Sequence, residues 1–140
     1  MCNLKIFFKQ DLSKGTMLPY IKYIQSQGWG VIVLNTNHNK DPETGDNILD
    51  SETPEKHAVT VWREIVTKCE AEKISVIAHS YGGVVSMALA GDDEVRPEFQ
   101  ERVVGVFLTD SVHYGLSGNR DLDNKLKQIS KNYIASDHVS

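Results

Sequence analysis

A serine in a turn of small residues is the feature of this sequence best suited to chemistry. Ser80 lies in the run Ala78-His79-Ser80-Tyr81-Gly82-Gly83, between an apolar run and a helix-forming run. A sharp turn from strand to helix brings two backbones together, so only small residues fit two positions away, here Ala78 and Gly82. Such a turn lifts the Ser80 hydroxyl above the sheet and aims the Tyr81 backbone N–H at a developing oxyanion. The pattern is typical of a serine nucleophile.

A serine of this kind needs a general base within hydrogen-bond reach and an acid that orients the base. Hydrolases of the α/β class supply these groups in the order serine, acid, histidine. Asp110 follows the next apolar run, at the sheet edge where such folds hold their ligands. A turn or cap role is the alternative for Asp110, because aspartate is common in both places. Asp110 is therefore the candidate acid.

Two histidines after Asp110 are candidates for the base. His138 gives the right order, but it is third from the end of the chain, where an unanchored terminus frays. His113 is closer to the sheet edge, and its alternative is a loop histidine packed beside Tyr114. His79 precedes the serine and is expected to point to the opposite side of the turn, where it supports the turn by a hydrogen bond. The base stays open between His113 and His138.

Composition and charge narrow the class of protein. The chain has 140 residues, 40% of them apolar and 24% charged, as expected for one globular domain. The net charge is −4, so we expect no basic surface for direct nucleic-acid binding. The chain has two cysteines and shows no signal peptide and no apolar run of about 18 residues. These features predict a reduced, intracellular protein without a membrane span.

No metal or cofactor site is expected. The acidic residues after the second strand lack the alternating spacing of a calcium loop. They are Asp41, Glu43, Asp46 and Asp50. Nearby, Asn37-His38-Asn39 lacks the partner ligands that zinc requires. We therefore expect a solvated loop.

The elements that position these residues follow from apolar runs and helical spacing. Four apolar runs predict strands, at Leu4–Phe8, Val31–Leu34, Ile74–Ala78 and Val103–Leu108. Helices are predicted from Thr16 to about Gln27, from Thr53 onward, from Tyr81 to Ala90 and from Asp121 to Tyr133. In the second helix the expected buried stripe is Ala58, Trp62, Ile65 and Cys69, widened by Val61 and Val66. Gly91 to Glu101 is predicted to be a charged connection.

This alternation predicts a doubly wound α/β fold, with about four mostly parallel strands and flanking helices. A complete α/β hydrolase has about eight strands and roughly 200 residues or more. We therefore expect residues 1–140 to form one incomplete α/β-hydrolase-like domain. A polar loop at about 35–53 is long enough to be functional, flexible or both. Without earlier strands, the strand at Val31–Leu34 would leave an unpaired edge, and the isolated chain would tend to aggregate.

Three segments together resemble one family. The first is Gly15-Thr16-Met17-Leu18-Pro19-Tyr20-Ile21-Lys22, which leads to Gly30-Val31-Ile32-Val33-Leu34-Asn35. The second is Thr53-Pro54-Glu55-Lys56-His57, which leads to Val61-Trp62. The third joins the serine turn to Leu108-Thr109-Asp110-Ser111-Val112-His113. From about Asp11 to Tyr133, the chain resembles the Argonaute-binding cotranscriptional regulator family, whose domain is also fused to some fungal histone deacetylases.

The resemblance implies a hydrolase-like domain with Ser80 in the nucleophile position. It also implies contacts with Argonaute and with chromatin or splicing factors, a role in gene silencing, and a location in nucleus and cytoplasm. Family members carry a His-Gly loop and a late histidine, whereas this chain has no His-Gly dipeptide and ends before that histidine. We therefore expect a truncated member that acts through protein contacts. The alternative is a serine esterase or amidase that cleaves a small ester or amide with Ser80, Asp110 and a histidine.

Overall fold

A parallel β-sheet forms the centre of the computed structural model, which describes residues 2–6, 18–112 and 119–134. The described strands form one five-stranded sheet in the order β2-β1-β3-β4-β5, with every neighbouring pair parallel. The strands are β1 (Cys2–Ile6), β2 (Gly30–Leu34), β3 (Ile74–His79), β4 (Val103–Thr109) and β5 (Ser130–Tyr133). The predicted α/β class with a mostly parallel sheet is confirmed, and each predicted strand overlaps one of the first four.

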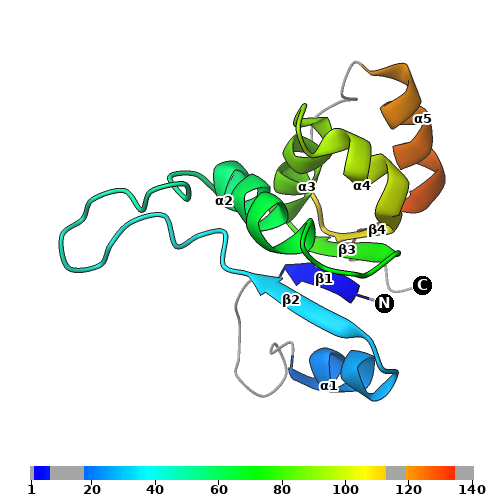
Figure 1. Ribbon diagram of the computed structural model, residues 1–140, viewed down its shortest axis with the longest axis horizontal. Helices are drawn as coiled ribbons and strands as arrows, with labels where there is room; N and C mark the ends of the chain where they lie inside the picture. The colour runs from blue at the N-terminus through cyan, green and yellow to red at the C-terminus, as the bar shows by residue number, and fades with distance from the viewer. Residues whose placement is uncertain (1, 7–17, 113–118, 135–140) are drawn as a thin grey trace, which may run out of the picture.

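The helices lie on both faces of this sheet. They are α1 (Leu18–Ser26), α2 (Pro54–Val61), the π-turn η1 (Trp62–Val66), α3 (Gly82–Gly91), α4 (Arg96–Arg102) and α5 (Arg120–Ile129). The step from β1 to β2 runs toward one edge of the sheet, and every later step runs toward the other edge. Because crossovers between parallel strands are right-handed, α1 lies on one face and α2 to α5 on the opposite face (Figure 1).

The main core fills the space between the sheet and helices α2 to α5. In β3, Ile74, Val76 and Ala78 are buried, in the alternation expected of a strand with one face on the core. The largest fully buried side chains of the helices are Trp62 and Phe99, whose ring centroids lie 5.6 Å apart. This packing fixes α2, η1 and α4 against the strands that carry Ser80 and Asp110.

Arg102 joins η1 to α4 through a half-buried polar network. Its guanidinium pairs with Glu98, which also accepts a hydrogen bond of 2.8 Å from Trp62 Nε1. The same guanidinium donates to the backbone carbonyls of Val66, Cys69 and Ala71. These carbonyls lie at and after the end of the helix, where the regular helical hydrogen bonding stops. Arg102 therefore acts as a C-terminal cap supplied from another helix.

The predicted stripe of the second helix is wrong at its C-terminal end. The helix widens into the π-turn η1, where the Thr67 N–H bonds the Trp62 carbonyl at 3.0 Å. A π-turn places one extra residue in the turn and so rotates the residues after it about the helix axis. Val66 is buried, as predicted, but Ile65 is 50% exposed and Cys69 is only partly buried.

Two further predictions differ from the structure. The helix expected to reach Tyr133 ends at Ile129, and the next four residues form β5 on the outer edge of β4. Pairing there satisfies backbone groups of β4 that a longer helix would leave open. The predicted connection from Gly91 to Glu101 contains α4, whose first turn holds Pro97, a position where the missing N–H does no harm. Thr16 and Met17 of the predicted first helix lie outside the described residues.

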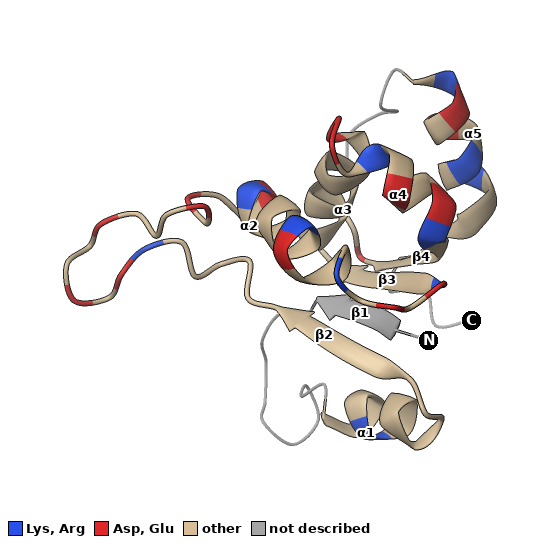
Figure 2. Ribbon diagram, viewed as in Figure 1, with Lys and Arg blue, Asp and Glu red and all other residues tan. Residues whose placement is uncertain are grey.

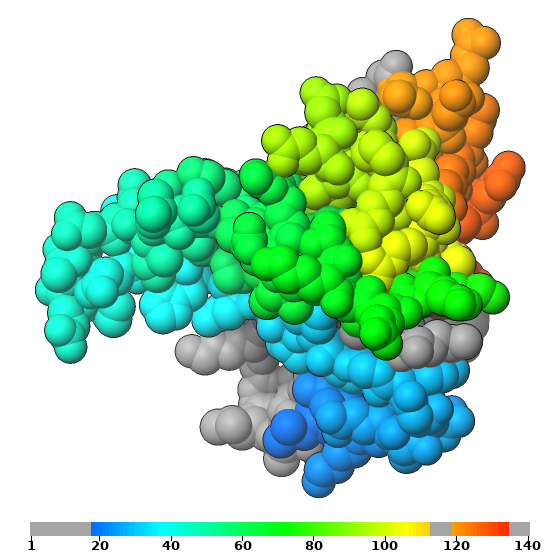
Figure 3. All heavy atoms as spheres, viewed as in Figure 1, coloured from blue at the N-terminus to red at the C-terminus, as the bar shows by residue number. Residues whose placement is uncertain are grey.

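Residues 35–53, which we call the arm, project from the body of the molecule (Figures 1 and 3). An antiparallel bridge joins Lys40 to Asn47, and the Asp41 N–H bonds the Asp46 carbonyl at 2.8 Å. The arm contains five acidic residues and one lysine, and its net charge of −4 equals that of the whole chain (Figure 2). The predicted long loop therefore has internal hydrogen bonds and carries the charge imbalance of the chain.

Candidate functional site

Ser80 lies in the turn between β3, which ends at His79, and α3, which begins at Gly82. Its φ is +51°, a left-handed backbone conformation that few residues other than glycine adopt. The Ser80 N–H bonds the Thr109 carbonyl at 3.0 Å, and its carbonyl accepts from the Gly83 N–H at 3.1 Å. The turn is therefore held by both β4 and α3.

The small residues of the turn are packed inside the molecule. Ala78 is fully buried, and Gly82 and Gly83 are buried at the start of α3. The hydroxyl of Ser86 donates to the Gly82 carbonyl at 2.7 Å. Their burial matches the prediction that small residues occupy the positions around Ser80.

Asp110 directly follows β4, the neighbour of β3, and so lies at the same edge of the sheet as Ser80. His79 and Thr109 are paired across β3 and β4, so Ser80 and Asp110 each follow one member of that pair. Asp110 also has a left-handed φ, +45°, and its N–H bonds the Tyr133 carbonyl of β5 at 2.8 Å. The carboxyl ends of parallel strands are the usual ligand edge of open α/β sheets. The acid role of Asp110 stays a prediction.

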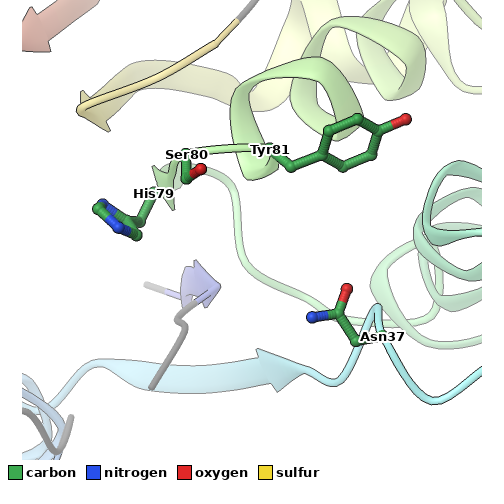
Figure 4. A pocket seen from close by; sticks show the side chains of 4 residues that line it. All are labelled: Asn37, His79, Ser80 and Tyr81. Carbon is green, nitrogen blue, oxygen red and sulfur yellow. The ribbon is translucent and has the colours of Figure 1, made fainter. Parts of the chain in front are cut away.

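His79 is directed away from the neighbouring Ser80 and Tyr81 side chains (Figure 4). Its Nδ1 lies 3.1 Å from the Thr109 hydroxyl, on the neighbouring strand. This contact links the ends of β3 and β4 just before the two strained residues. The position agrees with a supporting role rather than with proton transfer from Ser80.

An open pocket of about 310 Å³ adjoins Ser80. Its lining comprises Asn37, His79, Ser80 and Tyr81 (Figure 4). Asn37 comes from the start of the arm, just after β2, and faces the serine turn from across the pocket. The sequence pattern around Asn37 did not predict that this residue lines the pocket at Ser80. Its position after a parallel strand was the available signal.

The Tyr81 side chain connects the turn to α2. Its hydroxyl donates a hydrogen bond of 2.6 Å to Glu55 Oε1, in the first turn of that helix. Burial raises the pKa of Glu55, but hydrogen bonds, chiefly from Tyr81, outweigh it and leave the pKa below its usual value. The Tyr81 side chain thus ties α2 to the serine turn, and its backbone N–H stays the predicted oxyanion donor.

The base candidates His113 and His138 lie outside the described residues. Within the described part of the chain, no histidine is hydrogen-bonded to the Ser80 hydroxyl. His57 instead contacts Ser51, with Nδ1 2.9 Å from the hydroxyl oxygen. The Ser51 hydroxyl donates to the His38 carbonyl at 3.2 Å, so its single hydrogen is used and His57 must carry its proton on Nδ1. Burial, followed by repulsion from His38, lowers the pKa of His57.

The described residues hold neither a metal cluster nor a membrane-spanning helix. In the ranges 2–6, 18–112 and 119–134, no three histidine, cysteine, aspartate or glutamate side chains group as metal ligands would. No helix in the same ranges has the length and apolar character to cross a membrane. Acyl transfer at Ser80 stays a prediction.

Comparisons with known proteins match the chain to one domain family and to several curated relatives. The Arb2 domain model matches residues 38–139. The chain is 30% identical to the Cotranscriptional regulator ARB2A homolog of Gallus gallus, over 78% of this chain and 38% of the relative. It is 36% identical to a FAM172 family protein homolog of Caenorhabditis elegans, over 76% of this chain and 32% of the relative. It is 26% identical to the human Cotranscriptional regulator ARB2A, over 78% of this chain and 38% of the relative. The chain thus spans less than half the length of these curated relatives.

Proposed function

The chain belongs to the Arb2 domain family, and we propose that it is the hydrolase-like domain of a cotranscriptional regulator that acts through protein contacts. The family match over residues 38–139 carries this proposal, because it runs from the arm through the serine turn to β5. Several relatives are named cotranscriptional regulators. By the resemblance of the three sequence segments, its partners are Argonaute and chromatin or splicing factors, and it works in the nucleus and cytoplasm.

One feature of the sequence favours contacts with proteins over catalytic turnover. The sequence has no His-Gly dipeptide to supply a second oxyanion donor. Removal of one such donor typically slows an enzyme by about 10²- to 10³-fold. The chain is proposed to form one α/β-hydrolase-like domain.

Affinity purification from nuclear extract tests this proposal. The tagged full chain is expected to recover Argonaute or a chromatin or splicing factor, identified by mass spectrometry. Ser80→Ala serves as the matched variant and should recover the same partners, since contacts do not require the hydroxyl. Recovery of none of these proteins would reject the proposal, and partner loss in Ser80→Ala would point to a role for the serine.

A second candidate function is a serine esterase or amidase. It is favoured by the strained Ser80 in a strand-to-helix turn, with Asp110 after the neighbouring strand. The Ser80 oxygen would attack the carbonyl carbon while a histidine takes its proton, and Tyr81 N–H would stabilise the oxyanion. The bond to the leaving alcohol or amine would then break, with the proton passed to that group. Water would release the acyl group from Ser80.

A fluorophosphonate probe separates the two candidates. Labelling that disappears in Ser80→Ala and persists in Ser75→Ala would establish a reactive serine at the turn. Ser75 is a suitable control because it lies at the opposite end of β3. No labelling of the wild-type chain would reject the enzyme.

A further inference from the structure

A groove separates α2 from the C-terminal end of α3. Its volume is about 650 Å³, and its apolar lining includes Val59, Ala88 and Gly91. A Cβ placed on Gly91 would meet nothing within 4 Å, so the space beside this residue is open. The small residues leave room for the aliphatic part of a long side chain. We call this cavity the α2–α3 groove.

The cations that line the groove are already paired within the chain. Lys56 Nζ lies 2.9 Å from Glu52 and 3.5 Å from Asp50. Arg63 Nε lies 3.1 Å from Glu94. These pairs leave neither cation as an obvious partner for an anionic ligand.

Two carboxylates of the groove have neutral donors only. Glu55 accepts from the Tyr81 hydroxyl at 2.6 Å. Asp92 Oδ1 accepts from the backbone N–H groups of Glu94 and Val95, at 3.0 and 3.1 Å. Neither carboxylate has a cation within ion-pair distance among the described residues. A groove with apolar lining and two uncompensated carboxylates is complementary to a lysine or arginine side chain.

The arm extends this negative charge beyond the groove. Asp50 belongs to the arm and lines the groove, so the two surfaces are continuous. Since the arm carries a net charge of −4, it attracts basic segments over roughly the 8 Å Debye length of physiological salt (Figure 2). The backbone bonds of the arm hold these charges in place before a partner arrives.

We propose that the α2–α3 groove binds a lysine or arginine side chain from a basic segment of a protein partner. The aliphatic stem lies along Val59 and Ala88, and the cationic head meets Glu55 near the start of α3 or Asp92 just after its end. This proposal rests on the proposed function, because it supplies the contact surface for a regulator that works by binding proteins. A phosphate-rich partner is disfavoured by the same charges.

A peptide titration tests the groove directly. The probe is a fluorescein-labelled octapeptide of alternating alanine and arginine, titrated with the full chain at 150 mM salt and followed by anisotropy. Glu55→Gln and Asp92→Asn remove one charge each and keep an oxygen that accepts the same hydrogen bonds. Each is expected to weaken binding about threefold, and the double variant about tenfold.

Glu72→Gln is the matched control, because it removes one charge from an exposed residue that does not line the groove. It should leave the affinity unchanged. Equal weakening in all variants would show attraction by net charge alone and would overturn the groove proposal. Unchanged binding in the Glu55 and Asp92 variants would also overturn it.

The purification from nuclear extract then separates the two proposals. If the double variant recovers the same partners as the wild type, the groove is not the contact surface and the regulator function still stands. If the wild type recovers no such partner, the regulator function fails, while the titration still decides whether the groove takes a cationic side chain.

Discussion

Ser80 and Asp110 occupy equivalent places at the ends of two neighbouring strands. Each follows one member of the His79–Thr109 pair, and each has a left-handed φ, +51° and +45°. For a residue other than glycine, this conformation costs about 1–3 kcal/mol of folding free energy. It therefore persists only where the surrounding structure holds the residue in place. The surroundings here are the Thr109 and Tyr133 carbonyls, which accept hydrogen bonds from the two N–H groups.

Substitution of Ser80 should therefore follow backbone preference. Ser80→Gly is expected to keep or raise stability, while Ser80→Val should lower it by about 2 kcal/mol, because a β-branched residue is a true outlier at positive φ. Urea unfolding of both variants measures the difference. A valine variant as stable as the glycine variant would show that the turn relaxes.

Removal of the Arg102 side chain should destabilise the whole core. Arg102→Ala removes one donor from each of three carbonyls and the only cation paired with the partly buried Glu98 carboxylate among the described residues, and the expected loss is about 3–5 kcal/mol. Arg102→Lys should rescue only part of it, because an ammonium lacks the planar fork. Arg120→Ala, at the exposed start of α5, is the control. Urea unfolding curves at pH 7 check the ranking, and full rescue by lysine would contradict it.

Acidification should weaken the attachment of the arm through His57. The pKa of His57 is lowered in the folded chain, so the unfolded chain binds the additional proton more readily. The stability from neutral His57 is present above its usual pKa, about 6.5, and is lost as pH falls through the lower folded pKa. Thermal melts from pH 8 to 5 should show a fall that is smaller in His57→Gln. An equal fall in the variant would exclude His57 as the cause.

Gly105 should resist even alanine. A Cβ at this position would lie 2.8 Å from the Phe107 ring, so the ring must move. Gly105→Ala is expected to lose about 1–3 kcal/mol, as overpacking does. The Phe107→Leu background should recover most of that loss, since the two sites are in contact. Gly91→Ala is the control because its Cβ meets open space, and it should be neutral. Absence of rescue by Phe107→Leu would show that the strain is in the backbone.

The parallel sheet and the position of the serine turn could be predicted from the sequence because both depend on local signals. The β-branched run of β3 and the glycines after Ser80 identify a strand and a tight turn in almost any context. The regulator family indicated by the three sequence segments is likewise confirmed by the match to the Arb2 domain.

The features that could not be predicted depend on distant contacts. β5 is a short polar strand, Ser-Lys-Asn-Tyr, and it exists because β4 offers a free edge. Asn37 enters the Ser80 pocket because β2 and β3 end at the same edge of the sheet. Pro97 is typical of a connection between elements, although proline also begins helices, as it does in α4. For His113 and His138 the base assignment stays a prediction, since both lie outside the described residues.

The widened turn after α2 has a consequence for related chains of different length. A π-turn is what an α-helix becomes when one residue is inserted and the flanking contacts are kept. Deletion of a single residue between Trp62 and Val66 would restore a regular helix while leaving both ends in register with the sheet. We therefore expect related chains to gain or lose one residue at this turn. The same change within β3 would move every later side chain of the strand to the opposite face of the sheet.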